Sequence, residues 1–241
     1  MTEVTRHNQL DLSKINYSKP EHQQNVYYGS ISYNGLPCYI QTSKMTFVDM
    51  RDDKTSKQKY LVVTVDPRDF SFYDCLVTLD DHNLASTYKS SKEWFQKELP
   101  MDILETMYRR ITKPFKKDDT PEIELRIPVT KKKIQCNIYD QSNNIISADN
   151  LSKGSTIIGI LHMKGLKFLK KDYYCDMYVS QIKLCQSIPY SIPNQCLIID
   201  EEEIDTYDYE ILDEEVIQKN KQKLELEEQI KNLQKKIDNL N

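Results

Sequence analysis

The order in which strand-like and helix-like patterns occur constrains the fold of this chain most. Apolar and polar residues alternate through 122–127 and 174–184, as they do in half-buried strands. Between about 72 and 111 the apolar residues instead recur every three to four positions, as on the buried side of a helix. The chain is therefore predicted to carry a helical insertion within an antiparallel β structure.

Further strand patterns lie on both sides of this helical middle. Asn34-Gly35 is a dipeptide that tolerates positive φ, and it precedes a strand pattern at 36–41. Other strands are predicted at 45–50, 60–65, 134–138 and 156–163. Short strands with inserted helices favour a mainly β fold of α+β character, either a barrel or a sandwich.

The helical middle is predicted to hold three helices. The first runs from Phe72 to about Tyr88, the second surrounds Trp94-Phe95, and the third covers about 103–111. Asp102 is expected to cap the third helix, because Glu105 follows three residues later as in a capping box. Pro114 then ends this helix.

Charge is distributed unevenly along the chain. Residues 200–215 contain ten Asp or Glu and no Lys or Arg, whereas residues 1–196 carry 27 basic and 23 acidic side chains. Such an asymmetry is typical of a protein that binds a polyanion and controls that binding. The predicted organisation is an irregular arm over 1–30, a folded domain over 31–190, an acidic linker over 191–215 and a C-terminal helix over 216–241.

The C-terminal helix has the spacing of a short coiled coil. Leu226, Ile230, Leu233, Ile237 and Leu240 are separated by four and three residues in turn. This arrangement favours a parallel homodimer through 216–241. Only about two heptads are regular, so the alternative is a helix that packs on its own domain or frays.

Several functional classes are disfavoured by what the sequence lacks. None of the four histidines has a recognisable nucleophile beside it, and no Gly-rich phosphate loop or nucleophile elbow occurs, so we expect no enzyme and no catalytic residue. The six cysteines have neither C-x-x-C nor zinc-site spacing, so we expect reduced core thiols, no metal and no cofactor. The N-terminus does not resemble a signal peptide and no apolar run reaches about 18 residues, which predicts an intracellular protein without a membrane span.

Lysines and aromatic residues alternate in the second half of the chain, and this pattern suggests nucleic-acid binding. Lysines can neutralise phosphates, while aromatic rings can stack on the bases of a single strand. The alternative is that the aromatics belong to the core and the lysines end strands. The candidate phosphate-binding residues are Lys131, Lys132, Lys133, Lys164, Lys167, Lys170 and Lys171, and the candidate stacking residues are Tyr39, Phe168, Tyr173, Tyr174 and Tyr178.

Three segments also resemble a known family. They are the opening strand 33–45, with the phrase YNGLPCYIQTSKM, and the closing pair 159–168 and 175–184, with the phrases GILHMKGLKF and CDMYVSQIKL. Together they resemble the single-stranded DNA-binding proteins of nucleocytoplasmic large DNA viruses, a family similar to the phage T7 single-stranded DNA-binding protein. The resemblance covers about 30–186. It implies an OB-like antiparallel barrel with a helical insertion, a role in viral DNA replication, recombination and repair, and an acidic segment that contacts replication proteins.

The expected function is therefore non-catalytic binding of single-stranded DNA. The acidic segment 200–215 would modulate that binding or recruit replication proteins, in the host cytoplasm at viral replication sites. In the resembling phage protein the acidic run closes the chain, whereas here it is internal. The alternative function is a virion or scaffold structural protein that assembles through its C-terminal helix.

Overall fold

The chain divides into two compact units, Met1–Pro189 and Tyr190–Asn241. The computed structural model describes residues 3–23, 25–53, 58–115, 119–130 and 133–186 of the first unit, together with 218, 221–223, 225–231 and 234 of the second. The predicted acidic linker therefore lies outside the described residues, as do Lys131 and Lys132. The described residues of the second unit are helical, which agrees with the predicted C-terminal helix.

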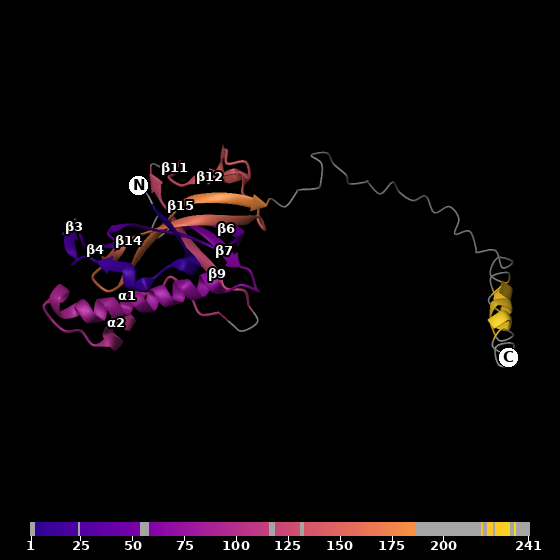
Figure 1. The fold of residues 1–241 in the computed structure, drawn as a ribbon, viewed down its shortest axis with the longest axis horizontal. Helices are drawn as coiled ribbons and strands as arrows, with labels where there is room; N and C mark the ends of the chain where they lie inside the picture. Colours follow the sequence, from indigo (N-terminus) through magenta and orange to yellow (C-terminus); the bar gives the residue numbers. More distant parts are fainter. Residues whose placement is uncertain are drawn as a thin grey trace, which may run out of the picture. The chain divides into compact units, whose positions relative to one another are not determined.

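The long strand β14 (Thr156–Phe168) organises the sheet of the first unit (Figure 1). On one edge it pairs in succession with β6 (Met45–Asp53), β5 (Leu36–Gln41) and β4 (Val26–Tyr33), always antiparallel. On the other edge it pairs with β15 (Tyr173–Gln186) through a register that shifts at three places. Such shifts are β-bulges, which bend a strand and increase its twist. These bulges allow β14 to remain paired on both edges while the sheet curls.

The curl continues through β6, β7 (Gln58–Val65) and β9 (Glu122–Ile127). The side chains of β9 then meet those of β15, because Arg126 pairs with Asp176 and lies over Tyr178. Within the described residues no ladder pairing joins these two strands. The sheet is thus a half-barrel whose final seam, between β9 and β15, is closed by side chains. This agrees with the predicted mainly β, OB-like fold with a helical insertion.

Shorter elements extend the far edge of β15. β12 (Asn137–Tyr139) and β8 (Tyr108–Arg109) both pair with it in parallel, and β13 (Ile145–Ile146) pairs with β12. β10 (Val129–Thr130) and β11 (Lys133–Ile134) form a separate two-stranded sheet. The single strand predicted at 134–138 is therefore divided between β11 and β12.

The prediction of an irregular N-terminal arm is wrong. β1 (Val4–Arg6) pairs with β5, while β2 (Ile15–Tyr17) and β3 (Glu21–Gln23) pair with β4, which itself begins within the predicted arm. Two short 3₁₀ helices, His7–Gln9 and Leu12–Lys14, connect the first strands, and a third covers Ala148–Asn150. Three-residue strands carry little periodicity of their own, and their partners lie elsewhere in the sequence, so local patterns miss them.

The helical insertion differs from the prediction in its boundaries. The first two predicted helices form one continuous helix, α1 (Ser71–Phe95), which ends at Gln96 in the left-handed conformation. The third is shorter, α2 (Met101–Met107), and Asp102 does not cap it, because the N-cap residue is Pro100. At the predicted turn, Asn34 and Gly35 do adopt positive φ, at 50° and 77°.

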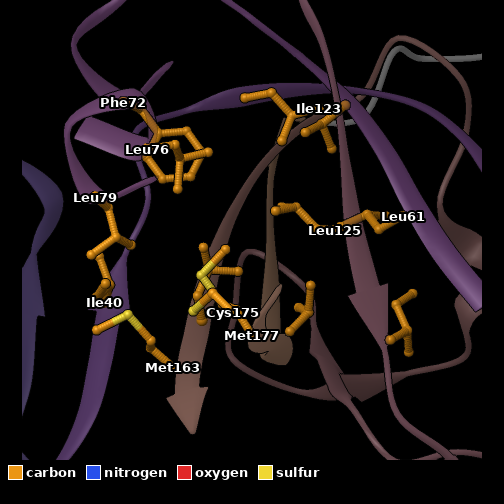
Figure 2. Packing of buried hydrophobic residues seen from close by; sticks show 14 of the residues in the cluster. Ile40, Leu61, Phe72, Leu76, Leu79, Ile123, Leu125, Met163, Cys175 and Met177 are labelled. Carbon is orange, nitrogen blue, oxygen red and sulfur yellow. The ribbon is translucent and has the colours of Figure 1, made fainter. Parts of the chain in front are cut away.

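The core lies between α1 and the inner face of the curled sheet. Phe72, Leu76 and Leu79 of α1 pack within the same cluster as Ile40 of β5 and Met163 of β14 (Figure 2). Because successive side chains of a strand point to opposite faces, the residues that alternate with these are directed away from α1. Five of the cysteines are free in the described part of the chain, three of them buried.

Candidate nucleic-acid interface

The outer face of the sheet, opposite the core, carries an aromatic row across three strands. His162 of β14 stands directly opposite both Tyr39 of β5 and Tyr178 of β15. The rings of Tyr39 and His162 are stacked, with centroids 4.4 Å apart, and Tyr178 meets His162 edge-on at 5.1 Å. The Tyr178 hydroxyl and His162 Nδ1 are hydrogen-bonded at 2.7 Å. These contacts hold three half-buried rings in fixed positions on one surface.

A second row crosses the same sheet nearer the turn between β14 and β15. Here Lys167 of β14 stands directly opposite both Tyr28 of β4 and Tyr174 of β15. The Tyr28 hydroxyl donates a hydrogen bond to Asp176 Oδ2 at 3.2 Å, and Lys164 Nζ lies 5.8 Å from the centre of the Tyr28 ring. This second row therefore combines two tyrosines with two lysines.

Arg126 connects the two rows at the seam between β9 and β15. Its guanidinium lies 5.8 Å from the centre of the Tyr178 ring and pairs with Asp176, which also accepts the Tyr28 hydrogen bond. Asp176 is only 8% exposed, so this ion pair is largely withdrawn from water. We call the whole set the aromatic–basic surface; it consists of Tyr28, Tyr39, Arg126, His162, Lys164, Lys167, Tyr174 and Tyr178.

The environment of this surface keeps its rings neutral. Partial burial, followed by the charge of Lys164, lowers the pKa of His162, while Asp176 acts in the opposite direction. Partial burial is also the main reason that the pKa of Tyr178 is raised. At neutral pH the histidine is therefore largely an uncharged ring, suited to stacking, and the positive charge comes from lysine and arginine.

Five of the predicted site residues lie on this surface. Tyr39, Tyr174 and Tyr178 are half-buried with part of each ring accessible, Lys164 is exposed, and Lys167 is half-buried. Lys170 and Lys171 are exposed in the turn that joins β14 to β15. Lys133 is exposed on β11, in the separate two-stranded sheet, and Lys131 and Lys132 lie outside the described residues.

The predicted stacking role is corrected for two residues. Phe168 and Tyr173 are 7% and 1% exposed, and their rings stack on each other with centroids 5.0 Å apart. Trp94 and Phe95 of α1 pack edge-on against Phe168, so this pair attaches the end of the helix to the sheet. Their rings belong to the core, where no base can reach them.

The sequence-based prediction missed three members of the surface. Tyr28 lies on β4, within the segment 1–30 for which the sequence predicts an irregular arm. Arg126 and His162 alternate with buried residues on β9 and β14, which places both on an outer face. That alternation was visible, but only the pairing of distant strands brings the two side chains to the tyrosines.

In the described part of the chain, no group of three or more His, Cys, Asp or Glu side chains is arranged to hold a metal ion. Among the helices described, none is long and apolar enough to cross a membrane.

The chain belongs to a family of unknown function (DUF5871), whose model matches residues 52–200. No curated protein matches the sequence. Membership of this family therefore assigns no activity to the chain.

Three solved structures from bacteriophages are similar to this fold. The single-stranded DNA-binding protein of bacteriophage Enc34 has a TM-score of 0.41 and 12% identity, over 80% of this chain and 99% of that one. The same phage protein in complex with single-stranded DNA has a TM-score of 0.41 and 10% identity, over 71% and 96%. Gp2.5 of bacteriophage T7, also a single-stranded DNA-binding protein, has a TM-score of 0.42 and 12% identity, over 65% and 98%.

Proposed function

We propose that this protein binds single-stranded DNA, without catalysis, on the aromatic–basic surface. The observation that carries the proposal is the pair of cross-strand rows centred on His162 and Lys167. Accessible rings in fixed positions offer faces on which successive bases can stack, at about 1–3 kcal/mol per base. Lysine and arginine beside the rings offer partners for the phosphates.

A single strand fits this surface better than a duplex. In a duplex the faces of the bases are stacked on one another, so half-buried tyrosines on a sheet could touch only the backbone. The formal charge of the chain is −4, and residues 1–196 contain only four more basic than acidic side chains, 27 against 23. Binding by charge alone would therefore be weak, and stacking would supply much of the affinity.

The proposal is tested by fluorescence anisotropy with a labelled oligo-dT, using the full chain. We expect binding at low salt that weakens as salt rises, because counterions are released from the phosphates. Lys164→Gln and Lys167→Gln should each reduce the slope of log affinity against log salt by about 0.7. Lys89→Gln, at an exposed position of α1, is the matched control and should leave the slope unchanged.

The same assay contains the results that count against the proposal. A chain that shows no binding of oligo-dT at low salt would not be a single-strand binder. Tighter binding to a duplex of equal length would assign the surface to backbone recognition. Tighter binding to oligo-rU would make RNA the ligand in place of DNA.

The biological role proposed with this activity is support of viral DNA replication, recombination and repair in the host cytoplasm. The resemblance of segments 33–45, 159–168 and 175–184 to the viral single-stranded DNA-binding proteins supports that role. Residues 200–215 would compete with DNA for the basic side chains or recruit replication proteins, since ten carboxylates can mimic a run of phosphates. Deleting 200–215 should then strengthen DNA binding, and weaker binding would exclude competition.

A second candidate function is supported by the C-terminal helix. Leu226 and Ile230 lie four residues apart and therefore on one side of the helix. They are 58% and 54% exposed. A structural protein that assembles through this helix would bury them against a second copy. Deleting 216–241 should then abolish assembly in sedimentation experiments without changing affinity for DNA. If the protein is a single-strand binder, it should bind DNA both with and without residues 216–241, whether or not it assembles.

A further inference from the structure

A pocket of about 490 Å³ lies at the seam between β9 and β15 and includes Tyr174, the end of the second row, in its lining. Tyr174 of β15 and Tyr60 of β7 line its sides, and the buried side chains of Leu125 and Met177 contribute to its lining. Pockets that bind small molecules typically occupy about 300–1,000 Å³, with an apolar lining and a few polar groups that fix the ligand. The size and lining of this pocket suit a flat, aromatic ligand.

Several charged side chains line the pocket. The cationic residues are Arg109, Arg110, Lys113 and Arg126, and the carboxylates are Asp53 and Glu124, of which Glu124 pairs with Lys113 at 2.7 Å. The arginines are held by carboxylates outside the lining, Asp172, Asp81 and Asp176. A guanidinium has five N–H donors, so one that is fixed by an ion pair still has donors for an anion.

A buried carboxylate fixes the segment that supplies two of the four cationic side chains, Arg109 and Arg110. Asp80 of α1 is fully buried and accepts hydrogen bonds from the backbone N–H groups of Ile111, at 2.9 Å, and Thr112, at 3.3 Å. It also accepts one from the Tyr108 hydroxyl at 2.8 Å. These bonds tie residues 108–112 to α1 and hold Arg109 and Arg110 at the mouth of the pocket. Arg109 and Arg110 thus project from a backbone segment that is anchored to α1, while their side chains remain 62% and 41% exposed.

The pocket is continuous with the aromatic–basic surface. Arg126 lines the pocket and lies over Tyr178 of the first row, and Tyr174 belongs to both the pocket and the second row. We infer that this pocket holds one nucleotide of the bound strand, with its base against Tyr174 and its phosphate at the cationic side chains that line the pocket. The inference rests on the proposed function, and it adds a defined site for a single nucleotide to a surface that otherwise offers only open stacking faces.

A nucleotide explains the lining better than a simple anion does. A phosphate ion would use the arginines but would leave the tyrosines and the apolar lining without a role. A nucleoside would use the rings but not the charges. Three probes separate these possibilities in calorimetric titrations of the full chain: dTMP, thymidine and inorganic phosphate. We expect dTMP to bind at least about tenfold more tightly than either of the others, because it alone uses both parts of the pocket.

The strand itself is tested by photo-cross-linking and affinity. An oligo-dT that contains 5-iododeoxyuridine should cross-link to Tyr174 on irradiation. Tyr174→Leu should lower the affinity for oligo-dT about 5- to 150-fold, the equivalent of about 1–3 kcal/mol of stacking. Tyr174→Phe keeps the ring and should retain the affinity, which separates loss of stacking from loss of folding. Tyr88→Leu, at an exposed tyrosine of α1, is the control.

The inference and the proposed function fail in different ways. If oligo-dT binds and cross-links to Tyr39 or Tyr178 but not to Tyr174, and Tyr174→Leu leaves the affinity unchanged, the pocket is not a nucleotide site although the surface binds DNA. If dTMP binds through Tyr174 but no oligo-dT binds, the pocket serves free nucleotides, and both the inference and the proposed function are overturned. If neither dTMP nor oligo-dT binds, both are likewise overturned.

Discussion

Gly165 of β14 lies directly beneath the ring of Tyr28 from the neighbouring strand β4. A β-carbon at position 165 would come within 2.7 Å of Tyr28 Cε1 and within 2.4 Å of the carbonyl oxygen of Gly29. Both separations are below any normal contact, and the second involves backbone, which cannot rotate away. The absence of a side chain at 165 therefore allows Tyr28 to cross β14 and reach Asp176 on β15.

This relationship predicts that Gly165→Ala destabilises the protein. The added methyl group must displace either the Tyr28 ring or the ladder between β4 and β14, and overpacking of this kind costs about 1–3 kcal/mol. The measurement is the free energy of unfolding from urea titration. Gly159→Ala in the same strand is the matched control, because its β-carbon would meet nothing closer than 3.7 Å. Equal stability of the two variants would show that Tyr28 does not depend on Gly165.

A second prediction concerns the buried carboxylate of Asp80. Asp80→Ala leaves the Tyr108 hydroxyl and the N–H groups of Ile111 and Thr112 without their acceptor, and each unsatisfied buried donor costs about 1–3 kcal/mol. We expect a loss of more than about 3 kcal/mol in the free energy of unfolding. Asp80→Asn should cost less, because burial already raises the pKa of this carboxyl group and the amide oxygen remains an acceptor.

The neighbouring residue supplies the control for this prediction. Asp81 pairs with Arg110 at 2.7 Å, but its side chain is 60% exposed. Asp81→Ala should therefore change the free energy of unfolding by no more than about 1 kcal/mol, the usual range for an exposed ion pair. A loss as large as that of Asp80→Ala would mean that the two carboxylates act together.

The strands that the sequence predicts well are those with a strong pattern of their own. Alternation at 122–127 corresponds to β9, which buries one face, and the β-branched run at 60–65 corresponds to β7, where the consecutive residues 61–63 are buried on both faces. β1, β2 and β3 have three residues each and are specified by pairing with β5 and β4. The same limit applies to the helices, where the weak amphipathic pattern near Ser90 concealed a helix that continues to Phe95.

The types of residue in the candidate site could be predicted from the sequence, but the arrangement of these residues in space could not. Lysine and tyrosine near 164–178 identified the β14–β15 hairpin, yet the residues that face solvent differ from those that fill the core. Phe168 and Tyr173 belong to the core because they are directed toward α1, and the strand bulges change which residues face outward. The contribution of Arg126 depends on the seam between β9 and β15, which only the curl of the whole sheet creates.

A third prediction concerns the dependence of stability on pH. The groups facing His162 are Tyr39 on β5, Tyr178 and Asp176 on β15, and Lys164 on its own strand. Because partial burial and Lys164 lower the pKa of His162, the unfolded chain binds this proton more readily than the native protein does. The stability should therefore be fully present above the ordinary value of 6.5 and should fall as the pH drops below it.

Urea titrations above and below pH 6.5 measure this effect. His162→Gln should flatten the decline in the free energy of unfolding on the acid side. His82 must be replaced separately, because burial and Lys89 lower its pKa as well. An unchanged decline in His162→Gln, together with a flattened one in His82→Gln, would assign the pH dependence to the helix and not to the aromatic–basic surface.

The last prediction separates the ring of Tyr178 from its hydroxyl group. Tyr178→Leu removes a stacking face beneath Arg126 and should weaken binding of oligo-dT about 5- to 150-fold, the equivalent of about 1–3 kcal/mol. Tyr178→Phe removes only the hydrogen bond to His162 and should keep most of the affinity, because the ring remains in contact with the His162 ring. Anisotropy titrations measure both variants. An equal loss in the two would assign the effect to the hydroxyl group and its bond to His162, and no loss in either would place the bases elsewhere on the sheet.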